Sequence, residues 1–149
     1  NYVVSMQLTA TIPTGSYSNG STNAVLGPTL EAGKGWGRFD IISCLGGTLP
    51  TGNVAKLGRA VAWNTTAQYK VGKYLWPEIE SNATYFHGGK NDGKLQNFLE
   101  PGFTTSKLRL RAANETSRTG WVFGAGMQIA TSRFHAYNHQ LIFTSRFIF

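Results

Sequence analysis

Apolar and polar residues alternate with a period of two along most of the chain. Residues 2–12 are the clearest case, with an unbroken apolar row on one parity and a mostly polar row on the other. Alternation over about eleven residues predicts a strand with one apolar and one polar face, long enough to cross a membrane at a tilt. The same pattern predicts eight strands, at residues 2–12, 25–33, 39–49, 57–71, 75–86, 96–106, 121–132 and 139–149.

Connections rich in glycine, proline and asparagine separate these strands. Pro13-Thr14-Gly15 and Pro50-Thr51-Gly52 each follow a strand, residues 87–93 are predicted to form an irregular loop, and tight turns are predicted at 33–37 and 72–74. Long and short connections therefore alternate, which is typical of an up-and-down transmembrane barrel. The polar stretch 107–120 is an exception, because it is long where a short turn is expected.

The last strand ends the chain on an aromatic residue. Leu141, Phe143, Phe147 and Phe149 share one parity, so they either pack in the core of a soluble sandwich or face lipid in a membrane barrel. Because seven earlier rows show the same alternation, a shared lipid-facing surface is the simpler interpretation. We therefore predict an all-β fold, an antiparallel up-and-down transmembrane β-barrel, with residues 1–149 in one domain.

Composition agrees with this prediction. Charged residues make up 14% of the chain, against about 25% in typical soluble domains, and glycine is abundant. No apolar run is long enough for a transmembrane helix, and one cysteine, Cys44, excludes an intrachain disulfide.

Because the chain begins in mid-strand without a signal peptide, we expect a processed or truncated N-terminus. The eight strands then form either a whole barrel or the C-terminal part of a larger one.

Net charge is +7, and most lysines and arginines fall at predicted turns. This distribution keeps cations out of hydrocarbon and places them near anionic lipid head groups. A basic stripe interleaved with stacking aromatics, which nucleic-acid binding requires, is not present. We therefore expect a lipid bilayer as the partner and no nucleic acid.

Charged and amide residues concentrate on the face opposite to the apolar rows. A carboxylate facing hydrocarbon would be costly, so these residues are predicted to line the lumen: Glu31, Asp40, Gln68, Lys70, Glu78, Glu80, Glu100, Gln128 and Arg146. Two interpretations remain open. In the first, Arg146 and Lys70 pair with glutamates and plug a narrow barrel; in the second, an acid-rich wall lines a water-filled path. Eight strands leave an interior just filled by side chains, so an open channel would need more strands or a homo-oligomer.

Candidate catalytic and metal-binding residues are few. Glu78 and Glu80 share a face and could exchange protons, and His139 beside Ser132 or Ser145 would suit a lipid hydrolase. No nucleophile elbow is present, however, and the histidines lack the spacing of metal ligands in a strand protein. We predict no enzymatic activity, no metal and no cofactor.

Several motifs resemble a known family. They are Phe39-Asp-Ile, Gly47-Thr-Leu-Pro-Thr-Gly52, Trp63-Asn-Thr-Thr-Ala-Gln-Tyr69, Gly88-Gly-Lys-Asn-Asp-Gly93, Phe98-Leu-Glu-Pro-Gly102 and the final aromatic strand. Together they resemble bacterial outer-membrane proteins of the MetA-pathway of phenol degradation, or transporter-like, family. The resemblance implies an outer-membrane barrel that passes small molecules, aromatic or hydrophobic ones included. It also implies that barrel-insertion machinery reads the terminal strand, with Phe147 and Phe149 as the insertion signal.

Three functions remain open. Passive transport of small molecules across the bacterial outer membrane is the first. The second is a structural or adhesive barrel with a plugged lumen and partner-binding extracellular loops. The third is a soluble, lipocalin-like ligand binder.

Overall fold

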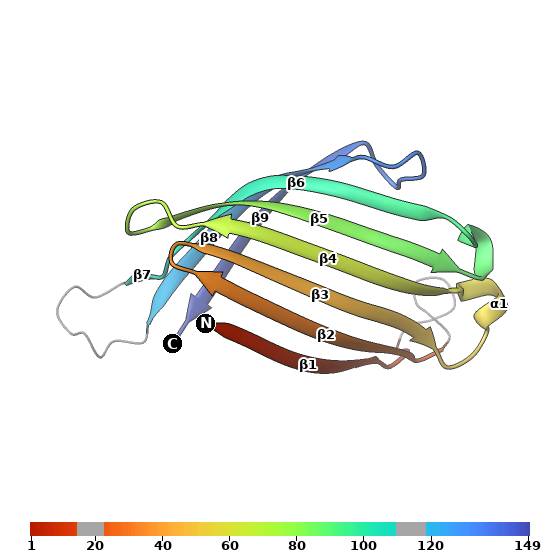
Figure 1. The fold of residues 1–149 in the computed structure, drawn as a ribbon. Coiled ribbons are helices and arrows are strands. Elements are labelled where there is room, and N and C mark those ends of the chain that lie inside the picture. The colour runs from red at the N-terminus through yellow and green to blue at the C-terminus, as the bar shows by residue number, and fades with distance from the viewer. Residues whose placement is uncertain (15–22, 110–118) are drawn as a thin grey trace.

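The computed structural model describes residues 1–14, 23–109 and 119–149, which form one antiparallel sheet curled into a half-barrel (Figure 1). The strands are β1 (Tyr2–Thr11), β2 (Val25–Trp36), β3 (Phe39–Pro50), β4 (Arg59–Tyr69), β5 (Leu75–His87), β6 (Leu95–Thr105), β7 (Leu108–Arg109), β8 (Gly120–Ala130) and β9 (His139–Ile148). Two short helices, α1 (Val54–Leu57) and η1 (Gly89–Asn91), lie in connections. The predicted all-β antiparallel fold is confirmed.

Strands that follow one another in the chain are neighbours in the sheet. The order is β1-β2-β3-β4-β5-β6-β8, with β9 on the other side of β8 and the two-residue β7 beside β8. β1 and β9 are thus the outermost long strands. Both termini and the short turns after β2 and β4 lie at one end of the sheet, which we call the turn rim; α1 and η1 lie at the opposite end, the loop rim (Figure 1).

The sheet has an apolar convex face and a polar concave face. On β2, for example, Leu26 and Leu30 are exposed on the convex side, whereas Thr29 and Glu31 are half-buried on the other. The same alternation holds across most of the sheet, so most of the large apolar side chains point outward. Among the described residues, one hydrophobic side chain is buried, that of Phe98, which is 3% exposed. A core of the kind that holds a soluble sandwich together is therefore not formed by this sheet alone.

The strands are strongly staggered. Residues paired across successive strands form one row on the concave face, running Ser5, Glu31, Cys44, Asn64, Asn82, Phe98 and Ala130. The row begins near the start of β1 at the turn rim and ends at the last residue of β8 at the loop rim. The strands therefore tilt relative to the rims, which is the geometry that a closed barrel requires.

Two predicted boundaries are wrong. The turn predicted at 33–37 is mostly strand: β2 continues to Trp36, and the chain turns at Gly37, which has a φ of 64°. The strand predicted to begin at 57 begins at Arg59, because α1 occupies Val54–Leu57 and Gly58 has a φ of 71°. A Cβ on Gly58 would lie 2.6 Å from the carbonyl oxygen of Gly88, so this glycine brings the connections holding α1 and η1 together.

The remaining strands end within three residues of their predicted limits. Gly15 and most of the long connection predicted at 107–120 lie outside the described residues. In the part of the chain that the structure describes, no helix is long and apolar enough to span a membrane.

Candidate functional site: a polar cavity on the concave face

The concave face encloses a cavity of about 860 Å³. Strands β3 to β6, β8 and β9 and the loop before β9 supply its lining. Because most of the lining comes from the inward parity of each strand, it is rich in amide, hydroxyl and carboxyl groups. Six of the predicted lumen residues lie together here: Gln68, Glu78, Glu80, Glu100, Gln128 and Arg146.

Three carboxylates gather on neighbouring strands of this wall. Glu80 on β5 is directly opposite Glu100 on β6, and Glu78 is two residues from Glu80 on the same face. Like charges placed opposite each other across two strands repel. The arrangement gives this part of the wall a concentrated negative charge.

Amide side chains hold one of these carboxylates in place. Glu100 Oε2 accepts hydrogen bonds from Gln128 Nε2 at 2.8 Å and from Asn82 Nδ2 at 3.4 Å. The bonds join three strands, β5, β6 and β8, through a single carboxylate. Hydrogen bonds to a charged acceptor are stronger than neutral ones, so Glu100 is fixed toward the cavity.

The loop between β8 and β9 folds onto this wall. Its Tyr137 stacks on Phe98, with ring centroids 4.5 Å apart and planes inclined by 15°. The Tyr137 hydroxyl donates a hydrogen bond to Gln128 Oε1, and the backbone N–H of Ala136 donates to Gln96 Oε1 at 3.1 Å. Tyr137, Gln128 and Glu100 therefore form one connected network, and the loop narrows the cavity toward the loop rim.

Internal hydrogen bonds give this loop a defined shape. Ser132 Oγ accepts from the N–H of Asn97 at 2.8 Å and donates to the carbonyl of Phe134 at 2.7 Å. His135 Nδ1 lies 2.8 Å from the Ser132 carbonyl oxygen, and Nε2 lies 2.8 Å from Asn138 Oδ1, so the ring bridges the two ends of the loop. These bonds fix the backbone on both sides of Tyr137.

The cations of the concave face do not pair with the glutamates. Lys70 Nζ instead lies 5.4 Å from the ring centre of Trp76, over its face, and Arg146 reaches the cavity from β9. Among residues 1–14, 23–109 and 119–149, the basic and acidic side chains that come within 4.0 Å of each other are those of His87 and Asp92, with 3.9 Å between Nδ1 and Oδ1. Of the two interpretations left open, the paired one requires ion pairs that these residues do not form: Lys70 and Arg146 lie near the turn rim and are not within 4.0 Å of a glutamate carboxylate.

The other predicted site residues lie outside the cavity. Asp40 lines a second hollow, of about 530 Å³, between the turn-rim ends of β1 to β3. Glu31 projects from the concave face of β2, paired with Cys44. Phe147 contacts Trp121 on the convex face at a centroid distance of 5.0 Å, and Phe149 is 89% exposed beside it.

Three aromatic residues of the lining were not predicted as site residues: Trp76, Phe98 and Tyr137. Trp76 and Phe98 carried a signal in the sequence, since each is an aromatic residue on the otherwise polar parity of its strand. Tyr137 carried none, because a loop residue has no parity and its inward position depends on how residues 131–138 fold back.

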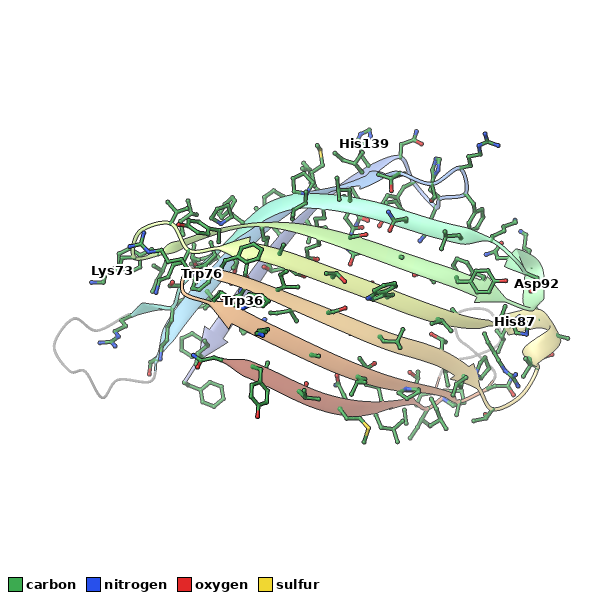
Figure 2. The ribbon with its side chains drawn as sticks, viewed as in Figure 1. Trp36, Lys73, Trp76, His87, Asp92 and His139 are labelled. Carbon is green, nitrogen blue, oxygen red and sulfur yellow. The ribbon has the colours of Figure 1, made fainter. Side chains whose placement is uncertain are left out.

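The arrangement of His139 with Ser132 that the sequence suggested is not formed, whereas Glu78 and Glu80 do share the cavity wall. The Ser132 hydroxyl donates to a backbone carbonyl, and His139 points outward from the convex face (Figure 2). Within the described parts of the chain, no three histidine, cysteine or acidic side chains are grouped so that they could hold a metal ion.

No known protein family, characterised protein or solved structure significantly matches this chain.

Proposed function

We propose that the sheet belongs to a transmembrane β-barrel of the bacterial outer membrane, through which small molecules with polar groups diffuse passively. One observation carries this proposal: the hydrophobic organisation is inverted, with apolar side chains outside and polar ones inside. In a soluble protein the same sheet would expose its most apolar surface to water and enclose its charges.

The convex face is large and contiguous. Tyr2, Met6 and Phe143 are 86%, 85% and 76% exposed, and exposed apolar residues occur on every long strand. Monomeric soluble proteins rarely expose an apolar patch beyond a few hundred Å². Lipid would remove this face from water, which is favourable because burying apolar surface stabilises by roughly 25 cal/mol per Å².

The stagger and the free edges favour closure into a barrel. Nothing in the described chain pairs with the outer edges of β1 and β9, and a bilayer does not tolerate unpaired strand edges. The tilt of the strands supports closure, because the strands of a closed barrel are tilted relative to its axis. Closure with further strands or with a second copy of the chain would complete the wall of the cavity and turn the concave face into a lumen wide enough for a solute.

The lining favours solutes that carry polar groups. Glu78, Glu80 and Glu100 have no cationic partner among the described residues, so they give the path a negative potential that attracts cations. Trp76 and Tyr137 add flat apolar surface, which suits aromatic parts of a solute. Small aromatic molecules, which the family resemblance implies, therefore fit the same path when they carry a polar or positive group.

A plugged structural barrel is the second candidate function. The observation that favours it is the inward loop, because Tyr137 and its network already narrow the cavity. In that case the loop rim would bind a partner, and no solute would pass.

Conductance of the purified chain in planar bilayers tests the first candidate against the second. We expect ion-permeable channels that prefer cations, because the acidic wall faces the path. The double variant Glu80→Gln/Glu100→Gln should lower the cation preference several-fold, whereas Asp92→Asn, which removes a carboxylate at the loop rim, should leave it unchanged.

Two results would contradict the proposal. A chain that inserts into bilayers without conducting would favour the plugged barrel. A chain that purifies without detergent as a stable monomer would favour the soluble, lipocalin-like binder instead.

A further inference from the structure

The turn rim carries a band of exposed basic and aromatic side chains. Lys34, Arg38 and Lys73 are exposed there, beside Trp36 and Tyr74, which are 50% and 49% exposed. We call these five residues the basic rim. Figure 2 shows Trp36 and Lys73 at this end of the molecule, on neighbouring parts of the curled sheet.

The two lysines are held over aromatic rings. Lys34 Nζ lies 5.0 Å from the ring centre of Trp36, and Lys73 Nζ lies 5.3 Å from that of Tyr74. Such contacts orient an amine without using its hydrogen-bond donors on a carboxylate. The amines therefore remain available to an anion that approaches from outside.

One described acidic side chain, Asp40, borders the basic rim, where it lines a hollow together with Lys34. Five acidic residues project from the concave face, and the sixth lies at the loop rim; these are Glu31, Asp40, Glu78, Glu80, Glu100 and Asp92. Among the described residues, none of the rim's three cations forms an ion pair within 4.0 Å, and Asp40 is one carboxylate beside three cations, so the rim keeps a net positive charge.

The basic rim also borders the apolar convex face. Lys34 projects from the same side of β2 as Leu30 and Ala32, so its amine lies where the apolar surface ends. Trp36 and Tyr74 have the amphipathic rings that membrane proteins place at the level of lipid head groups. A soluble phosphate would need the cations, but it would not need this border with an apolar surface.

We propose that the basic rim binds the phosphate groups of anionic phospholipids. The inference rests on the proposed transmembrane function, and it identifies the lipid class that surrounds one rim. Each lysine or arginine near an anionic surface strengthens binding roughly fivefold. Three exposed cations then give a marked preference for an anionic over a zwitterionic head group.

The test uses the full chain in vesicles of phosphatidylcholine, with and without phosphatidylglycerol. Lipid preference is measured by energy transfer from tryptophan to dansyl-labelled phosphatidylglycerol, relative to dansyl-labelled phosphatidylcholine. The triple variant Lys34→Gln/Arg38→Gln/Lys73→Gln should reduce the preference by roughly tenfold or more. The control Lys56→Gln/Arg59→Gln/Lys90→Gln removes the same charges at the loop rim and should retain most of the preference.

Insertion into vesicles of phosphatidylcholine alone is measured in parallel, by protection from protease. A wild-type chain that inserts but shows no preference for phosphatidylglycerol would show that the basic rim does not bind anionic lipid, and it would leave the transmembrane proposal intact. If the two triple variants lose the same amount of preference for phosphatidylglycerol, the assignment is also overturned, because the net charge of the chain would then explain the preference. A chain that enters no bilayer overturns the transmembrane proposal and the rim assignment together.

A soluble competitor distinguishes lipid from free phosphate. Glycerol 3-phosphate should displace labelled phosphatidylglycerol no better than sodium chloride of equal ionic strength. Stronger displacement by the phosphate ester would identify a soluble ligand and show the lipid assignment to be wrong.

Discussion

At the scale of single residues, Tyr137 has the most specific role that the structure indicates. Its ring stacks on Phe98 and its hydroxyl binds Gln128, so one side chain fixes the loop and narrows the cavity. Tyr137→Ala should increase single-channel conductance in planar bilayers, because the ring no longer occupies the path. It should also lower the free energy of unfolding by about 1–3 kcal/mol through lost aromatic packing and a lost hydrogen bond.

Tyr137→Phe is the matched control for this change. It removes the hydroxyl and keeps the ring, so conductance should stay near the wild-type value while stability falls by about 0.5–1.5 kcal/mol. An alanine variant that conducts like wild type would show that the path does not pass Tyr137.

At the scale of elements, β9 contributes an aromatic edge to the convex face. Trp121, Phe147 and Phe149 form a chain of ring contacts at the turn rim, with centroid distances of 5.0 and 6.3 Å. We predict that deleting Phe149 slows insertion into bilayers several-fold, because the terminal ring no longer anchors the strand at the interface. Conductance of the molecules that do insert should change little, since Phe149 points away from the cavity.

Phe143→Leu provides the comparison, because it alters an exposed ring in the middle of β9 rather than at its end. Insertion is followed by protection from protease, with and without reconstituted insertion machinery. Normal insertion of the Phe149-deleted chain would remove this residue from the insertion signal.

At the scale of the whole molecule, the two sheet edges decide whether the half-barrel is closed. A strand at the edge of the sheet bonds to one neighbour only, so half of its backbone groups point away from the sheet. We predict that in bilayers the peptide covering β1 exchanges its amide hydrogens as slowly as β4, which has neighbours on both sides. Hydrogen exchange followed by mass spectrometry measures this directly. Fast exchange of half the β1 amides in an inserted chain would mean that its edge stays open.

The alternation by itself determined the fold class, the order of the long strands and the polar face of each. This was possible because the side-chain period in a strand is two, so position along the strand fixes the face. Parity therefore placed Glu78, Glu80 and Glu100 on one surface before any contact was known. It also separated the apolar rows from nearly every charge.

Only the tertiary structure decided what these residues contact. Arg146 lies near the turn rim and lines the cavity without forming an ion pair with its glutamates, and β4 begins two residues late because Gly58 lies against Gly88. Tyr137 reaches Phe98, which is 39 residues earlier in the chain, only because the loop folds onto a curved wall. Such contacts depend on the curvature and stagger of the whole sheet, and a pattern of neighbouring residues determines neither.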